Sequence, residues 1–197
     1  MRFIDRPLGL AIGVFFAGAF VGALLVSLSP NARAFALLLV QARIVTPMQA
    51  VSRFGNLMVF TTIFLNNSVP VFLSFLYPFA LGKIKWTPPL AVRRRSMLLG
   101  SYTIITAFLA GLFSLGAPIA IASALGGLAL VTLFLAEARI HGPLEIAFVL
   151  VCIAEPLRII PSNGGDLVGR LSKDRWLLPL SLAGLLASAA IEVFLRV

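Results

Sequence analysis

Six long runs of apolar residues, separated by short polar connections, constrain this chain more than any other feature of its sequence. A membrane-spanning helix needs about 20 mostly apolar residues. Runs of this kind lie at 8–28, 57–80, 97–115, 118–136, 143–160 and 176–195. We therefore expect an all-α protein, a polytopic transmembrane helical bundle with about six spanning helices, that forms a single domain over residues 1–197.

The composition is typical of a protein embedded in a bilayer. Hydrophobic residues make up 60% of the chain and charged residues 12%, and the mean hydropathy is +1.04. Soluble domains carry about 25% charged residues, so this chain has too few charges to coat a surface that faces water. The short connections also leave no room for a separate soluble catalytic domain.

The positive charges lie between the apolar runs. The chain has 16 Lys and Arg residues against 7 Asp and Glu residues, a net charge of +9. In a membrane protein such charges set the topology and contact anionic lipid headgroups, so we expect lipid and not nucleic acid as the partner. Because five of them fall within Lys83–Arg95, we expect the 81–96 loop and the N-terminus to be cytoplasmic, in a multi-pass protein of the cell membrane.

Two connections carry predictions of their own. Residues 31–56 contain an apolar run at 34–40 that is too short to span, followed by Pro47. We expect one or two interfacial helices here, with a re-entrant segment as the alternative. The runs 97–115 and 118–136 are separated only by Gly116 and Ala117, which predicts a tight helical hairpin and leaves a count of five to seven spans open.

The first run carries two pairs of glycines with helical spacing, Gly9 with Gly13 and Gly18 with Gly22. At about 100° per residue the second pair lies on the opposite face from the first. Small residues spaced in this way let helices approach closely in a membrane. We expect this helix to lie between two neighbours and the protein to form a homodimer; alternatively, the glycines reflect only their general frequency in membrane helices.

A polar segment interrupts the second run at Asn66, Asn67 and Ser68, and Pro70 follows. Pro70 has no N–H group, so the carbonyl of Asn66 loses its usual helical partner. Neutral oxygens of this kind bind cations where membrane helices are broken. The structural alternative is that the amides bond to a neighbouring helix and Pro70 only kinks the span.

A second polar segment joins the fourth and fifth runs and contains Glu137, His141, Gly142 and Glu145. Pro143 favours the first position of a helix, which makes Gly142 the expected N-cap and Glu145 a residue that caps the first turn. The functional alternative is that His141 and Glu145 converge to bind a metal or relay a proton. A single histidine excludes a multi-histidine zinc site, so the identity of any metal stays open.

Two further pairs of opposite charge lie near the ends of runs. Glu155 and Arg158 are three residues apart, so they pair on one helix face, either at the interface or along a polar path. Glu192 and Arg196 are expected to form an interfacial ion pair. The chain has no Gly-x-Ser-x-Gly, His-Glu-x-x-His or phosphate-loop motif, so we expect no catalytic residue, no cofactor and no enzyme activity.

The two polar segments resemble the stage II sporulation protein M family of integral membrane proteins. The resemblance rests on FLNN at 64–67 and on HGPLEIA at 141–147, and it covers roughly residues 57–160. The Asn-Gly motif that the family has between these segments has no counterpart here, where residues 83–87 read KIKWT. The sole Asn-Gly pair, Asn163 with Gly164, comes later in the chain.

The resemblance implies a helical bundle with Asn66, Asn67, His141 and Glu145 close together in its core. It also implies a non-catalytic scaffold for membrane and cell-envelope proteins, which is the function we expect from the sequence. The alternative is a small ion or solute transporter or channel, with its polar site at the break near Pro70 and the turn near His141.

Overall fold

The computed structural model describes residues 5–42, 46–83, 90–139, 141–159 and 167–194, and within these ranges it contains helices and no strand. The predicted all-α class is therefore confirmed. The helical elements are α1 (Arg6–Leu28), α2 (Pro30–Val40), α3 (Thr46–Ser52), α4 (Asn56–Lys83), α5 (Leu90–Gly111), the π-helical turn η2 (Leu112–Gly116), α6 (Ala117–Ala138), α7 (His141–Arg158), α8 (Leu167–Lys173) and α9 (Leu177–Phe194).

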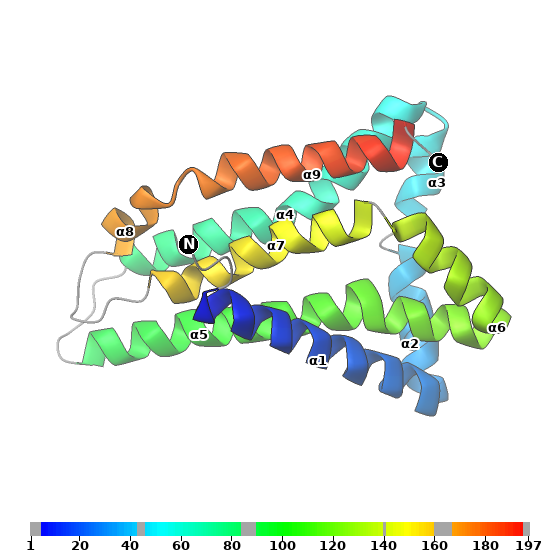
Figure 1. The fold of residues 1–197 in the computed structure, drawn as a ribbon, viewed down its shortest axis with the longest axis horizontal. Helices are drawn as coiled ribbons and strands as arrows, with labels where there is room; N and C mark the ends of the chain where they lie inside the picture. The colour runs from blue at the N-terminus through cyan, green and yellow to red at the C-terminus, as the bar shows by residue number, and fades with distance from the viewer. Residues whose placement is uncertain (1–4, 43–45, 84–89, 140, 160–166, 195–197) are drawn as a thin grey trace.

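The helices α1, α4, α5, α7 and α9 run along the length of the molecule, and α2 and α3 cross one end of them (Figure 1). Within the described ranges, four helical stretches are long and apolar enough to cross a membrane, against the six expected: α1, α4, α9 and the stretch Arg93–Ala136. The helix α7 packs against α1, α4, α5 and α9. It is therefore the central helix, although it carries the acidic and basic side chains of His141, Glu145, Glu155 and Arg158.

The predicted hairpin at Gly116 and Ala117 is wrong, because the backbone stays helical through both residues. α5 continues through the π-helical turn η2 into α6, so the two predicted spans form a single stretch of 44 residues, Arg93–Ala136. The chain changes direction later, at Gly127, whose φ of 59° and ψ of −150° suit glycine and few other residues. Gly116 instead lies against α1, where a Cβ atom would collide with the backbone carbonyl of Ala19.

Glycines let α1 approach α5 and η2 at backbone distance. A Cβ atom at Gly18 would collide with the carbonyl of Phe108, and one at Gly111 would collide with the carbonyl of Phe15. Gly22 similarly faces Leu112. Of the two glycine faces predicted on α1, the chain itself thus uses the one with Gly18 and Gly22; Gly9 and Gly13 are exposed.

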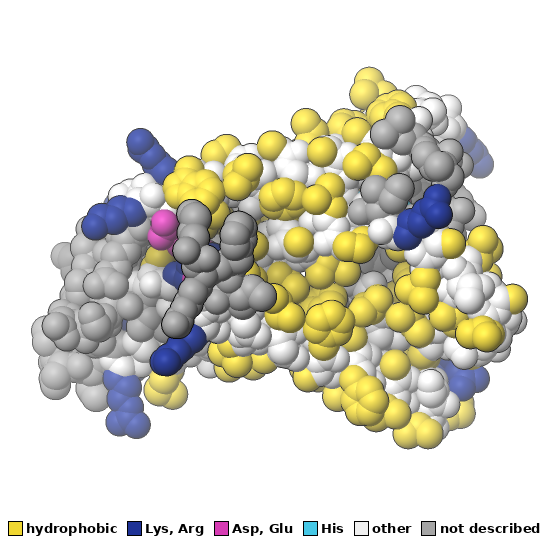
Figure 2. Space-filling model, viewed as in Figure 1, with side chains coloured by type: hydrophobic (Ala, Val, Ile, Leu, Met, Phe, Trp, Pro, Cys, Tyr) yellow, Lys and Arg dark blue, Asp and Glu magenta, His cyan; other side chains and the backbone are white. Residues whose placement is uncertain are grey.

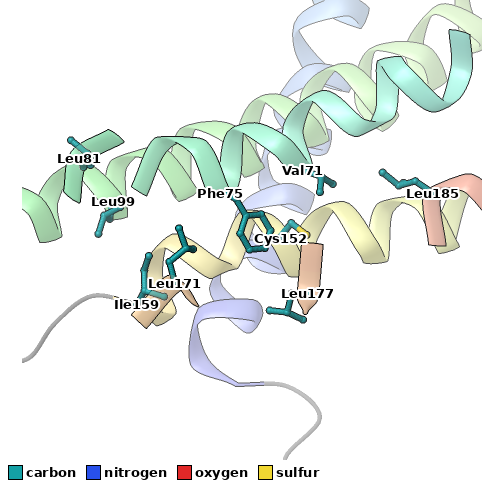
Figure 3. Packing of buried hydrophobic residues seen from close by; sticks show 9 residues of the cluster. All are labelled: Val71, Phe75, Leu81, Leu99, Cys152, Ile159, Leu171, Leu177 and Leu185. Atoms are coloured by element: carbon teal, nitrogen blue, oxygen red, sulfur yellow. The ribbon is translucent and has the colours of Figure 1, made fainter. Parts of the chain in front are cut away.

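A buried apolar cluster joins α4, α5, α7, α8 and α9 (Figure 3). Its members are Val71, Phe75, Leu81, Leu99, Cys152, Ile159, Leu171, Leu177 and Leu185. Lipid tails are as apolar as these side chains, so the stability gained here comes from close packing and not from the exclusion of water. Over the face drawn in Figure 2, hydrophobic side chains cover the middle of the molecule, and Lys and Arg side chains lie near both ends.

The glycine contacts predict that Gly18→Ala destabilises the protein and Gly13→Ala does not. The added methyl group at Gly18 meets backbone atoms of Phe108, which cannot move aside cheaply, so we expect a loss of about 1–3 kcal/mol. No atom lies within 4 Å of a Cβ at Gly13, so that change should stay within about 0.5 kcal/mol. Thermal unfolding of both variants in detergent measures the difference, and equal effects would contradict the assigned interface.

Candidate polar site between α4 and α7

The polar segment of α4 lies inside a continuous helix. Of the two alternatives for this segment, a helix broken at Pro70 and a span that only bends there, the structure has a continuous helix: α4 runs through both Pro70 and Pro78. The hydroxyls nearby bond to their own helix: Ser68 Oγ donates to the carbonyl of Phe64 at 2.7 Å, and Ser74 Oγ donates to the carbonyl of Pro70 at 2.8 Å. Pro70 thus removes one backbone donor without ending the helix, because the surrounding turns keep their hydrogen bonds.

A carboxylate from α7 meets this segment. The side-chain amide of Asn67 donates a hydrogen bond to Glu145 Oε1, across 78 positions of sequence. The amide of Asn66 in turn donates to Asn67 Oδ1 at 3.3 Å. The capping role predicted for Glu145 is therefore replaced by a contact between helices, since the hydrogen bond found for its side chain goes to α4 and not to the first turn of α7.

Two cavities meet at this contact. The first, of about 430 Å³, lies among α1, α4, α5, η2 and α7, and the second, of about 380 Å³, lies among α4, η2, α6, α7 and α9. Five residues line both of them: Asn66, Asn67, Ser114, Glu145 and Ile146. The hydrogen-bonded pair of Asn67 and Glu145 therefore stands on the wall that the two cavities share.

The structure distributes the predicted site residues between the two cavities. Pro70 lines the first, and His141 and Gly142 line the second. The carbonyl of His141 accepts a hydrogen bond of 3.0 Å from Ser188 Oγ of α9, which ties the start of α7 to that helix. Glu137 belongs to α6, but its side chain lies outside the described part of the structure.

Several residues of the two cavities were not singled out from the sequence. Tyr102 and Thr106 line the first, and their spacing of four residues on α5 would have placed them on one helix face. Glu192 lines the second together with Arg139. The interfacial ion pair predicted for Glu192 involves Arg196, which lies outside the described residues.

The secondary candidates Glu155 and Arg158 form a separate cluster, about 15 Å along α7 from Glu145. Arg158 donates to Glu155 Oε2 at 3.2 Å and, through Nε, to Asp5 Oδ2 at 2.6 Å. The predicted pair is thus present, and Asp5 is an added partner. Asp5 also caps α1 by accepting from the N–H of Leu8 at 3.0 Å. The Arg158 guanidinium holds the pKa of Asp5 below its usual range. The cluster joins the start of α1 to the end of α7.

The charges in the two cavities favour a cation. Side chains that line the first cavity include amides, hydroxyls, aromatic rings and one carboxylate, that of Glu145, and no Lys, Arg or His is among those described there. The second adds Glu192, Arg139 and His141. Over the ranges that the structure describes, no group of three or more His, Cys, Asp and Glu side chains is placed to hold a metal ion. The oxygen atoms of Asn66, Asn67, Ser114 and Glu145 are thus the polar groups that both cavities offer to a cation.

Comparison with known proteins adds no relative: no family model, no curated protein and no solved structure matches the chain. The resemblance to the stage II sporulation protein M family therefore stays a prediction that rests on the residues at 64–67 and 141–147.

The contact between Asn67 and Glu145 predicts that Glu145→Gln and Glu145→Leu behave differently. Gln keeps an acceptor for the Asn67 amide, whereas Leu leaves that amide unpaired inside the bundle. We expect Glu145→Leu to lower the free energy of unfolding by about 1–2 kcal/mol, and Glu145→Gln to change it much less. Unfolding in detergent measures both; equal losses would mean that the charge of Glu145, not its hydrogen bond, supports the fold.

Proposed function

We propose that the chain binds a small cation within the membrane and carries it across, with Glu145 as the charged group of the site. The observation that supports this most is the position of Glu145, which is hydrogen-bonded to Asn67 on the wall shared by two cavities. Glu145 lies near the start of α7, but its side chain meets Asn67 near the middle of the apolar helix α4. An ionisable side chain at such a position is costly and usually marks an ion or substrate pathway.

The two cavities give the proposed site a route on each side. The second reaches Arg139 and His141 at the end where α7 begins, and the first reaches Tyr102 on α5 in the opposite direction. A cation at Glu145 would compete with the Asn67 amide for the same carboxylate oxygen. Breaking that hydrogen bond would free the carboxylate for the cation, which both cavities already reach.

Cation binding predicts a specific thermal stabilisation of the purified protein. In detergent, we expect one of Na⁺, K⁺ or tetramethylammonium to raise the unfolding midpoint; a ligand at about 100 times its Kd stabilises by about 2.7 kcal/mol. Glu145→Gln should lose this response, because it removes the charge and keeps the shape. In proteoliposomes, the same variant should lose uptake of that cation.

Glu155→Gln is the matched control for this experiment. It also removes a carboxylate from α7, but Glu155 lies in the cluster with Arg158 and lines neither cavity. It should lower the baseline stability and keep the response to the cation. A wild-type midpoint that no cation moves would contradict the proposal.

A scaffold for membrane and cell-envelope proteins is the second candidate, and the glycine face of α1 favours it. Gly9 and Gly13 are exposed, and a Cβ at Gly13 would meet no atom within 4 Å. This face is therefore free for a helix of a second copy, which would give the predicted homodimer, or of a partner protein. A wild-type protein that shows no cation response and no uptake would favour this function, which involves no catalysis.

We also propose that the end at which α1 and α5 begin faces the cytoplasm (Figure 1). Described Lys and Arg residues gather there: Arg6, Lys83, Arg93, Arg94, Arg95, Lys173 and Arg175. The opposite end has fewer, namely Arg33, Arg53 and Arg139. The bias follows the positive-inside rule and brings these side chains to anionic headgroups.

Residues 1–4 and 84–89 of the segments predicted to be cytoplasmic lie outside the described residues. In this orientation α2 and α3 are the interfacial helices of the outer surface.

The orientation predicts opposite labelling of two engineered cysteines in a Cys152→Ala background. In sealed right-side-out vesicles, a membrane-impermeant maleimide should label Arg53→Cys and should label Arg94→Cys only after the membrane is opened. Both native side chains are exposed, so accessibility to the reagent is matched. The reverse pattern would invert the topology.

A further inference from the structure

We infer that the ligand of the Asn67 and Glu145 site is an amphiphile with an alkylated ammonium head and an apolar tail, which enters from the bilayer between α4 and α5. This inference rests on the proposed function and names its substrate class. Three observations support it: where α4 and α5 touch, which side chains surround the space between them, and which residues stand at its outer edge.

α4 and α5 contact each other sparsely, and the contacts found join them on one side of the first cavity. There the rings of Tyr77 and Tyr102 stack with centroids 4.6 Å apart, and the hydroxyls of Ser74 and Tyr102 lie 3.3 Å apart. The hydroxyl of Tyr77 also donates to the carbonyl of Leu98 at 3.4 Å. Beyond this tyrosine contact the two helices form facing walls of the first cavity.

The outer edge of the first cavity is apolar and exposed. Val69 and Leu73 of α4 and Leu109 of α5 all line the cavity, and they are 52%, 46% and 43% exposed. In a bilayer these side chains meet lipid tails, whereas Asn67 and Glu145 are partly buried deeper in the same space. The cavity therefore changes from apolar at the bilayer to polar at its base, and this order matches an amphiphile that enters head first.

The lining of the first cavity combines aromatic rings with one acidic side chain. Phe15, Tyr102 and Phe113 line it together with Glu145. Aromatic faces attract quaternary ammonium groups, which carry their charge without an N–H donor. A carboxylate in a medium of low dielectric constant adds a stronger attraction than it would in water. The volume of about 430 Å³ lies within the range of small-molecule sites.

The test uses wild-type protein in dodecyl maltoside, an uncharged detergent, with two probes. Dodecyltrimethylammonium has the head and the tail, and tetramethylammonium has the head alone. We expect both to raise the unfolding midpoint, with an apparent Kd at least tenfold lower for dodecyltrimethylammonium by equilibrium dialysis. Glu145→Gln should lose both responses, because both heads need the carboxylate.

Two variants at the outer edge separate lateral entry from binding at Glu145. Leu73→Trp or Leu109→Trp should weaken dodecyltrimethylammonium at least tenfold and leave tetramethylammonium unchanged, since a larger side chain blocks the tail and spares the base. Leu76→Trp is the control, because Leu76 is also an exposed leucine of α4, at 58%, and lines a different surface. It should leave both probes unchanged, and either edge variant suffices if the other fails to fold.

The outcomes distinguish the two proposals. If tetramethylammonium binds through Glu145 but the tail adds no affinity, or if the edge variants leave the affinity for dodecyltrimethylammonium unchanged, lateral entry is overturned and the proposed function stands. If no ammonium probe and no inorganic cation moves the wild-type midpoint, both are overturned. A dimer of the wild type that Leu73→Trp dissociates would place a second copy at this edge and would also overturn lateral entry.

Discussion

A polar side chain inside a bilayer must find a partner within the protein, and the central helix of this structure depends on that requirement. α7 carries Glu145, Glu155 and Arg158, and each has a partner on its own or another helix. Glu145 bonds to Asn67 of α4, and Arg158 joins Glu155 to Asp5 at the start of α1. These contacts allow the three side chains to lie in a helix with apolar neighbours, because in lipid the alternative for each group is an unpaired polar atom.

Close backbone contact holds α1 against α5, whereas polar side-chain contacts hold α7 against its neighbours. Gly18 and Gly22 on one side and Gly111 and Gly116 on the other remove the side chains that would hold these helices apart. The same contact explains the continuous path from α5 into α6. Gly116 packs against Ala19 and keeps a helical backbone. The chain changes direction at Gly127, where the backbone takes a conformation that suits glycine.

The contact between Asn67 and Glu145 that helps to position α7 is also the centre of the proposed site. Asn67 satisfies Glu145 when no ligand is bound, and a cation would take its place. The aromatic rings of Phe15, Tyr102 and Phe113 and the opening between α4 and α5 belong to the cavity and not to the packing of α7. These features support an amphiphilic ammonium ligand, because helix packing alone would not require them.

The amino-acid sequence alone indicates a helical, membrane-embedded chain, because apolar runs of about 20 residues with few charges are long enough to cross a bilayer as helices, which satisfy their backbone polar groups internally. It also singled out Asn66, Asn67 and Glu145, since polar groups within such runs are costly. Tertiary contacts, in turn, determine that Glu145 faces Asn67 and not its own first turn, that Gly18 and not Gly13 packs within the chain, and that residues 116–118 continue a helix. The same tertiary contacts place Tyr102 on the wall of the first cavity and Asp5 beside Arg158. Local sequence patterns do not distinguish these choices, because each depends on contacts between residues distant in sequence.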